Sequence, residues 1–285
     1  MKKILWPTLA VVLLTFSCTG KQTNADDEVS PDSVADSTDT AMVDTLEQLI
    51  TETPMPRAAD AMFDDFVFNF VANKRLQYER IVFPLRVTQV DGKTTLTEKS
   101  QWKMEHFFMR QGYYTLLFGD DDQMAHMKDT AVNEAVVEKI MLQKNEVKDF
   151  YFQRIRGAWM MREVRMNPLE TNANASFLAF YKQFVSDSAF QVRSINETVE
   201  FIGPDPDDDF NMMEGVITPD TWEAFAPQLP EKVLYNIIYG KQVPEGNQKI
   251  FLMRGVANGL ELELRFKKVG GKIACRFTKL LSWNV

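Results

Sequence analysis

The stretch YFQRIRGAWMMREVRM, from Tyr151 to Met166, reads as two short strands around a turn at Arg156 and Gly157. A related stretch, RFKKVGGKIACRFTKL, begins 114 residues later at Arg265. Glycine permits the positive φ that such a turn needs. We therefore expect each stretch to form the hairpin that closes one of two related domains.

An internal repeat runs through the C-terminal part of the chain at this spacing. The aligned pairs include Phe63 with Phe177, Gln77 with Gln191, Asn133 with Asn247, and Phe152 with Phe266. In the middle, LLFGD at Leu116 aligns better with IIYGK at Ile237, a spacing of 121 residues. We interpret the pattern as a duplication with domains at residues 58–171 and 172–285, in which the second copy has gained about seven residues and later lost them.

Each copy is predicted to open with a helix that carries a stripe of aromatic residues. The stripe is Phe63, Phe66, Val67 and Phe70 in the first copy, and Phe177, Phe180, Tyr181 and Phe184 in the second. We expect Asn174 to cap the second of these helices. A further helix is predicted around EKSQWKMEHFF, residues 98–108, and around PDTWEAFAPQ, residues 219–228.

Strands are predicted to follow the helices in each copy. In LELELRF, the side chains of Leu260, Leu262, Leu264 and Phe266 face one way and those between them face the other. VVEKIMLQ, KDFYFQRI and GAWMMREV are the counterparts in the first copy. This order predicts an α+β fold, with the helices packed on one face of a curved antiparallel sheet.

The order of elements resembles the nuclear transport factor 2-like fold, a cone-shaped, cystatin-like α+β architecture. The Phe-striped helices and the hairpins FQRIRGAWMM and RFKKVGGKIAC carry the resemblance, which covers residues 58–285. The first hairpin has Trp159 two places after the turn glycine, whereas the second has Ile273 there. The resemblance implies two tandem domains of this fold. Because such domains often pair through their sheets, it also implies that the two copies form an intramolecular pseudo-dimer.

The first residues predict an export signal, residues 1–17, followed by a lipid anchor. Lys2 and Lys3 precede the apolar run ILWPTLAVVLLTF, which is too short for a comfortable membrane span. TFSC then resembles the cleavage box of bacterial lipoproteins, although Thr15 stands where leucine is usual. This implies a diacylated Cys18 in an outer-membrane lipoprotein of the cell envelope, on the periplasmic or the surface face. Ordinary secretion is the alternative.

Residues 18–57 are predicted to form a disordered acidic tether. From Thr19 to Arg57 there are nine acidic residues, two basic residues and no aromatic residue, too little apolar surface to offset the entropy of ordering. Four tripeptides, DSV at Asp32, DST at Asp36, DTA at Asp39 and DTL at Asp44, resemble an O-glycosylation signal of some Gram-negative anaerobes. That resemblance implies glycans on Ser33, Ser37, Thr40 and Thr45, and chance occurrence in a Ser/Thr-rich linker is the alternative. The whole layout resembles an uncharacterised family of envelope lipoproteins from Gram-negative gut anaerobes.

No catalytic, cofactor or metal motif stands out in the sequence. The net charge of −8 gives no electrostatic footprint for nucleic acid. There is no G-x-S-x-G, P-loop or G-x-G-x-x-G, and Cys18 and Cys275 have no metal-ligand spacing. The acidic runs at Asp120–Asp122 and from Asp205 lack the pattern of a calcium loop and are predicted to be solvated loops. We interpret His106 as a structural or surface histidine rather than a catalytic one.

The remaining candidates for a functional site are hydrophobic side chains. Trp159 and Met161 fall on one face of their predicted strand and Met160 on the other, so both faces need cover. Trp159, Met161 and His106 are therefore the candidates for a pocket or for a face between the two copies. The sequence favours a non-enzymatic envelope protein, without cofactor or metal, that binds an unknown protein, a glycan or an apolar ligand. The alternative is a hydrolase or isomerase with an active cone in the first domain.

Overall fold

The structure is a computed structural model that describes residues 55–205, 208–244, 246–268 and 275–283. Its helices are α2 (Phe63–Ala72), α3 (Lys74–Arg80), α4 (Asp121–Ala125), α5 (Ala175–Ser186), α6 (Ser188–Arg193) and α7 (Trp222–Phe225). The strands of the N-terminal half are β1 (Ile81–Thr88), β2 (Thr94–Thr97), β3 (Tyr113–Phe118), β4 (Glu134–Met141), β5 (Glu146–Ile155) and β6 (Ala158–Pro168). Those of the C-terminal half are β7 (Ile195–Asp205), β8 (Asp208–Ile217), β9 (Val233–Tyr239), β10 (Gln248–Gly255), β11 (Glu261–Lys268) and β12 (Cys275–Trp283).

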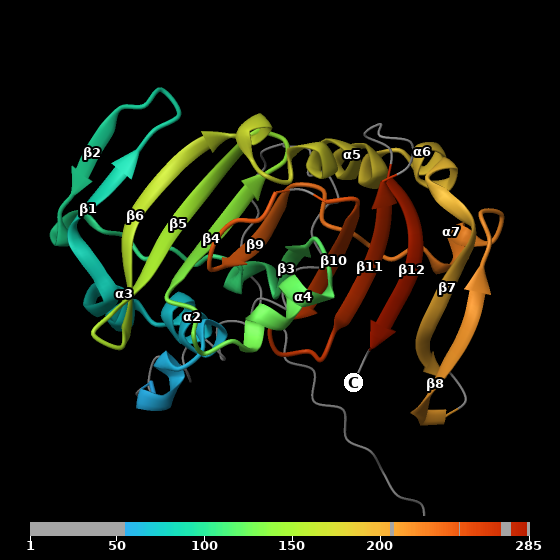
Figure 1. Ribbon diagram of the computed structural model, residues 1–285, viewed down its shortest axis with the longest axis horizontal. Coiled ribbons are helices and arrows are strands. Elements are labelled where there is room, and N and C mark those ends of the chain that lie inside the picture. Colours follow the sequence, from blue (N-terminus) through green and yellow to red (C-terminus); the bar gives the residue numbers. More distant parts are fainter. Residues whose placement is uncertain (1–54, 206–207, 245, 269–274, 284–285) are drawn as a thin grey trace, which may run out of the picture. The chain divides into compact units, whose positions relative to one another are not determined.

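Short 3₁₀ turns connect these elements and complete an α+β fold, as predicted (Figure 1). The turns are η1 (Arg57–Asp60), η2 (Lys99–Gln101), η3 (Met109–Gln111), η4 (His126–Lys128) and η5 (Leu169–Thr171). Across the part of the chain that the structure describes, none of the helices has the length and apolar character needed to span a membrane.

The two aromatic-striped helices form where they were predicted. α2 buries Phe63, Phe66, Val67 and Phe70, and α5 buries Phe177, Phe180, Tyr181 and Phe184. Asn174 directly precedes α5, but its side chain makes no capping bond to the helix. Its Oδ1 accepts a hydrogen bond from Lys249 Nζ at 2.6 Å instead. The prediction of a side-chain cap is therefore wrong, because the amide is engaged by another strand.

The further helices lie elsewhere than predicted. α3 and α6 directly follow the opening helices, whereas residues 98–108 form only η2 and an extended segment. Residues 219–228 contain just the four-residue α7. The first of these predictions fails because the side chain of Gln77 bonds both the N–H and the C=O of Glu105, and a helix would need those groups.

The hairpin predicted at Tyr151–Met166 forms, with its turn at Arg156 and Gly157. β5 and β6 pair antiparallel up to Ile155 opposite Ala158. Arg156 and Gly157 between them have φ of 52° and 83°, as a two-residue type I′ turn requires. β11 and β12 also pair antiparallel, while the turn of the second stretch, residues 269–274, lies outside the described residues.

Two six-stranded sheets form with the same kind of strand order. The first runs β2-β1-β6-β5-β4-β9 and the second runs β8-β7-β12-β11-β10-β3. Both sheets are mixed, because β1 runs parallel to β6 and β7 runs parallel to β12. The prediction of an antiparallel sheet is wrong for these two pairs. In each pair the strands are joined by a long crossover through the intervening strands rather than by a hairpin, which permits parallel pairing.

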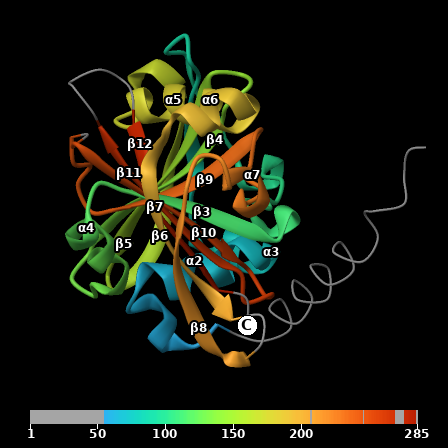
Figure 2. The ribbon, with the colours of Figure 1, turned by 90° about the vertical axis from the view of Figure 1, so that its right-hand side faces the viewer.

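The two sheets exchange one strand each. β3 of the N-terminal half is the edge strand of the second sheet, where it pairs with β10. β9 of the C-terminal half is the edge strand of the first sheet, where it pairs with β4. In Figure 1 the orange β9 accordingly lies beside the green β4. In Figures 1 and 2 the helices α5 and α6 lie on the opposite side of the strands from α2.

Side chains of the exchanged strands bond the sheet edges to each other. The Thr115 hydroxyl on β3 donates to the carbonyl of Tyr235 at 2.5 Å and accepts from the N–H of Tyr235 at 3.0 Å. Asn236 on β9 accepts from the N–H of Leu117 through its Oδ1 at 2.8 Å. These bonds satisfy backbone groups at edges that would otherwise expose them.

Aromatic side chains fill the space between α2 and the first sheet. The Phe63 ring lies 5.2 Å from that of Phe152 on β5. Phe107 and Phe108 are buried at the end of this core, with the Phe107 ring 4.5 Å from that of Phe150. A second core surrounds α5, and it includes Ile140 and Val147 of the first sheet and Leu142 from the turn between β4 and β5. Each core therefore joins the two halves of the chain.

Candidate functional site

The structure places Trp159 and Met161 in the first core, where both are 0% exposed. The Trp159 ring packs edge-on against Phe63 at 4.8 Å, and the Arg154 guanidinium lies 4.9 Å from its centre. Neither residue lines a cavity described below. The predicted lipid anchor and O-glycosylation sites lie outside the described residues; they are Cys18, Ser33, Ser37, Thr40 and Thr45.

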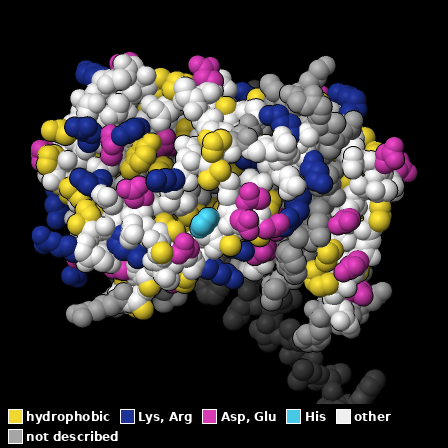
Figure 3. All heavy atoms as spheres, in the orientation of Figure 1, with side chains coloured by type: hydrophobic (Ala, Val, Ile, Leu, Met, Phe, Trp, Pro, Cys, Tyr) yellow, Lys and Arg dark blue, Asp and Glu magenta, His cyan; other side chains and the backbone are white. Residues whose placement is uncertain are grey.

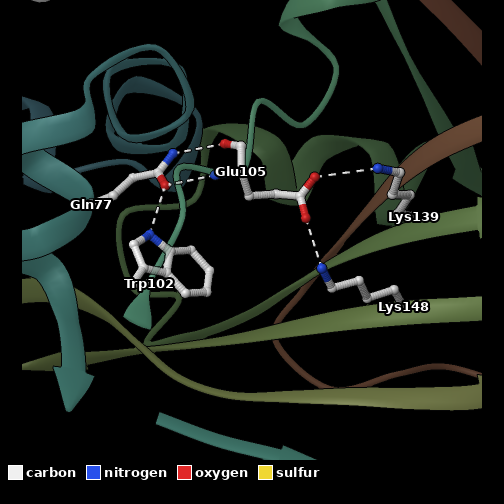
Figure 4. Close-up of polar contacts among 5 residues, drawn as sticks. All are labelled: Gln77, Trp102, Glu105, Lys139 and Lys148. Carbon is white, nitrogen blue, oxygen red and sulfur yellow. Dashed lines mark hydrogen bonds and ion pairs between the residues drawn. The ribbon is translucent and has the colours of Figure 1, made fainter. Parts of the chain in front are cut away.

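His106 lies apart from this pair, at a shallow hollow of about 700 Å³. The central group of the hollow is Glu105, whose carboxylate accepts from Lys148 Nζ at 2.7 Å and from Lys139 Nζ at 3.3 Å (Figure 4). Burial favours the neutral form of Glu105, but the two lysines outweigh it and hold the pKa of this carboxyl below its usual range.

Gln77 on α3 fixes the segment that carries Glu105. Its Nε2 donates to the Glu105 carbonyl at 2.8 Å, and its Oε1 accepts from the Glu105 N–H at 3.1 Å and from the Trp102 indole at 3.2 Å (Figure 4). Lys139 and Lys148 lie directly opposite each other on β4 and β5, where like charges repel. Glu105 bonds both lysines and offsets one of their two positive charges, so we assign it a structural role rather than that of a catalytic base.

A larger cavity of about 980 Å³ lies on the other face of the first sheet. Side chains alternate along β4, so that Lys139 points to the hollow of Glu105 while Val136 and Glu138 line this outer-face cavity. Residues of β1, β5 and β6 and residues 171–172 and 240–242 line the rest. Figure 3 shows basic, acidic and hydrophobic side chains intermixed over the region of β4 to β6.

Glu138 is 2% exposed and fixed through both of its carboxylate oxygens. Asn172 Nδ2 donates to one and Asn236 Nδ2 to the other, each at 2.6 Å. The two amides cannot turn round, because the Oδ1 of Asn172 accepts from the N–H of Asn174 and that of Asn236 accepts from the N–H of Leu117. Burial, together with the nearby charge of Asp149, raises the pKa of Glu138 to about 7.

Asp149 lies on β5, directly opposite Glu138. Only one of its two carboxylate oxygens accepts a hydrogen bond from the part of the chain that the structure describes. Its Oδ2 accepts from Asn167 Nδ2 at 2.7 Å. Asp149 is only 8% exposed. Its Oδ1 is buried and has no hydrogen-bond partner among the described residues. Burial raises the pKa of Asp149 to about 6. The Tyr151 hydroxyl is near enough to lower the pKa of Asp149, but it forms no well-aligned hydrogen bond to Oδ1. A cavity-lining carboxylate with an oxygen in this state is a candidate contact for a ligand.

Charged residues of both signs surround the cavity mouth. Arg165 pairs with Glu163 at 2.8 Å, and its guanidinium lies 4.7 Å from the centre of the Tyr151 ring. Arg162 donates to Gln153 Oε1 at 2.6 Å. The cavity therefore has both donors and acceptors at its mouth and carboxyl groups at its floor.

Sequence reasoning missed Glu138 and Asp149. A signal was present in VVEKIMLQ, because Glu138 interrupts the apolar alternation of Val136 and Ile140 on one face of the strand. Asp149 gave no comparable signal until the register of β4 and β5 placed it opposite Glu138.

The acidic run at Asp120–Asp122 has structural partners. Asp120 caps α4 by accepting from the N–H of Gln123 at 2.8 Å, and Asp121 pairs with Arg265 at 2.7 Å. Within the described ranges, no cluster of His, Cys, Asp and Glu side chains is arranged to hold a metal ion.

Residues 42–280 match the model of a family described as Domain of unknown function (DUF4348). The chain belongs to the DUF4348 family. The DUF4348 chain is also similar to the crystal structure of a nuclear transport factor 2-like (NTF2-like) protein from Bacteroides fragilis NCTC 9343. The two are 36% identical with a TM-score of 0.71, and the match covers 81% of this chain and 100% of the other. No curated protein matches the DUF4348 chain.

These similarities confirm the prediction of an uncharacterised family with an NTF2-like fold. The predicted duplication, the domain boundaries and the envelope location stay predictions.

Proposed function

We propose that the protein is a non-enzymatic binding protein of the cell envelope, whose ligand site is the outer-face cavity. The observation that carries the proposal is the buried Oδ1 of Asp149, which lacks a hydrogen-bond partner among the described residues. A polar acceptor buried without a donor costs free energy unless a ligand satisfies it. Pockets that combine a few directed polar groups with apolar walls are the usual sites for small molecules.

The N-terminal pattern supports the envelope location. The apolar run before Cys18 suits an export signal, and the acidic residues that follow suit a solvated tether. On this proposal a lipid on Cys18 holds the folded part at the outer membrane, within reach of ligands at the membrane surface.

We further propose that the folded part is a duplicated NTF2-like domain that forms an intramolecular pseudo-dimer. The matching strand order of the two sheets supports this proposal. So does the exchange of β3 and β9, which correspond to each other at the spacing of 121 residues. The ligand cavity uses this arrangement, because Asn236 from the C-terminal half fixes Glu138 at its floor.

A hydrolase or isomerase is the second candidate, and the facing carboxyls of Glu138 and Asp149 are the observation in its favour. Two features favour binding over catalysis. Aromatic rings occupy the core where enzymes of this fold place acid–base residues. Both oxygens of Glu138 already accept hydrogen bonds from amides, so this group is not free to exchange protons with a substrate.

The cavity can be tested by filling it. Val136→Trp places a large ring in the cavity, and Leu96→Trp, on a β2 residue that is 60% exposed, is the matched control. Ligand binding to the full chain is measured by saturation-transfer NMR with neutral saccharides, primary amines and short carboxylates as separate probes. We expect at least one class to bind the wild type and Leu96→Trp but not Val136→Trp. Equal binding to all three proteins would overturn the assignment of the cavity.

A further inference from the structure

β4 and β5 carry two like-charged pairs at neighbouring positions. Lys139 lies opposite Lys148 on one face and Glu138 lies opposite Asp149 on the other. Like charges directly opposite each other destabilise a sheet. Glu105 pairs with both lysines, whereas in the part of the chain described by the structure the two carboxyls form no ion pair with a Lys or Arg. Only the more distant charges of Lys249, near Glu138, and Arg165, near Asp149, favour their ionised forms. The carboxyl pair is therefore kept at a cost in stability, as is common at functional sites.

Both carboxyls are buried, and they differ in the hydrogen bonds that their oxygens already accept. Glu138 accepts from an amide at each oxygen and is nearly inaccessible. Asp149 accepts at Oδ2 from Asn167 and leaves Oδ1 without a donor at the cavity floor. Asp149 is thus the residue that contacts a ligand, and Glu138 behind it adds negative charge without forming a contact.

The charges around the cavity restrict what kind of ligand fits. The cavity lining carries four basic residues, Arg86, Arg162, Arg165 and Lys241, and four acidic ones, Glu134, Glu138, Asp149 and Glu163, so its formal charges balance and favour neither a cation nor an anion. The carboxyls at the floor disfavour an anion that reaches Asp149. A neutral ligand with several hydroxyl groups fits these charges, because each hydroxyl can donate to Asp149 and can also accept from the cationic groups at the mouth.

We propose that the outer-face cavity binds a neutral, hydroxyl-rich ligand, a saccharide, through a hydroxyl group that donates to Asp149 Oδ1. This inference deepens the proposed function and rests on it, since it names the ligand class of the same cavity. Tyr151 and Arg165, whose guanidinium lies 4.7 Å from the centre of the Tyr151 ring, also line the cavity and offer further hydrogen-bonding groups to a saccharide.

The test replaces a hydrogen-bond acceptor with a donor at one position, Oδ1 of Asp149. In Asp149→Asn the retained oxygen keeps the bond from Asn167, and the new amide group points its N–H bonds to the cavity where Oδ1 accepted. A ligand hydroxyl that donated its hydrogen to Oδ1 in the wild type then faces an N–H group in the variant and loses this hydrogen bond. We expect affinity for neutral mono- and disaccharides, measured by saturation-transfer NMR and titration calorimetry on the full chain, to fall at least about tenfold.

Two controls make the result decisive. Asp65→Asn makes the same chemical change on an exposed residue of α2 outside the cavity and should bind as the wild type does. Thermal unfolding should show Asp149→Asn to be at least as stable as the wild type, so that weaker binding does not reflect unfolding. If Asp149→Asn binds saccharides normally while Val136→Trp does not, this inference is wrong but the cavity assignment stands. If no neutral saccharide binds at millimolar concentration, or only amines or carboxylates do, the inference is overturned.

Discussion

The indole N–H of Trp222 donates to Gln191 Oε1 at 2.9 Å. Trp102 makes the same contact with Gln77 in the N-terminal half, at 3.2 Å. The two contacts join residues that correspond under the proposed duplication, although Trp102 stands in an extended segment and Trp222 begins a helix. The side-chain contact thus agrees between the halves where the local backbone does not.

Replacing Gln77 should cost more than replacing Gln191. Gln77 is fully buried, and its side chain bonds Phe70, Trp102 and both backbone groups of Glu105. Gln77→Ala leaves several of these groups without partners and should lower the free energy of unfolding by about 3 kcal/mol. Gln191→Ala should cost about 1 kcal/mol. Urea denaturation measures both, and equal losses would contradict the proposed role of Gln77 in fixing the Glu105 segment.

Asn236 should contribute more to stability than Asn167. Asn236→Ala removes the partner of the Leu117 N–H and one of the two partners of the buried Glu138, so we expect a loss of about 2–4 kcal/mol. Asn167→Ala removes a single bond to Asp149 and should cost about 1 kcal/mol. Denaturation midpoints at fixed pH compare the two variants. A smaller loss for Asn236→Ala would mean that the amide does not join the two sheets.

The stability difference between Asp149→Asn and the wild type should grow with pH. The folded chain raises the pKa of Asp149 from 3.8 to about 6, so the folded state binds this proton more tightly than the unfolded state does. The associated stability is fully present below about pH 4 and is lost as the pH rises through about 6. Asparagine does not titrate. Relative to the wild type, the variant should therefore gain roughly 2–3 kcal/mol between pH 4 and pH 8.

Denaturation of both proteins at several pH values gives this difference directly. Glu138 remains in both proteins, but part of the rise in its pKa comes from the charge of Asp149, so in the variant this carboxyl titrates at a lower pH and the difference includes that change. A difference that is flat across this range would show that Asp149 titrates as an exposed carboxyl does.

How much of this fold could be predicted depended on the range of the interactions. The helices of Phe63 and Phe177 were predictable because their stripes repeat within single turns. The extended segment of Glu105 was not, because a side chain from another element, Gln77, holds its backbone. The sequence carried one sign of the strand exchange. The spacing between matching residues changes from 114 to 121 in the region that forms β3 and β9.

The candidate site was less predictable than the fold. Trp159 was chosen because it is aromatic and lies on an apolar strand, and these same properties place it in the core. Asp149 was overlooked because one aspartate in a strand is unremarkable until its partners are known. Its burial, its open oxygen and its neighbour Glu138 all depend on strand register.

Cys18→Ser should release the protein from membranes. If Cys18 carries the lipid, the wild type should sediment with the outer membrane and partition into detergent, because two acyl chains anchor a protein stably. The variant should appear in the soluble fraction of the envelope. Thr19→Ser, one residue further on, is the matched control. A wild type that is soluble after export would show that the signal is an ordinary secretory one.

The four tether residues Ser33, Ser37, Thr40 and Thr45 should carry glycans in the native host. Mass spectrometry of tether peptides should find sugar masses that disappear when the preceding aspartates, Asp32, Asp36, Asp39 and Asp44, are replaced by asparagine. Unmodified peptides from the native envelope would end this prediction.

The exchange of strands also fixes the order in which the chain can complete its sheets during synthesis. β3 leaves the ribosome more than a hundred residues before β10, its only strand partner in the described sheets, and β4 has no neighbour on one side until β9 is made. For that interval the nascent chain carries an unpaired strand and an open sheet edge, both of which attract other chains. The N-terminal half cannot reach its final state alone, so its protection from aggregation depends on how soon the C-terminal half follows.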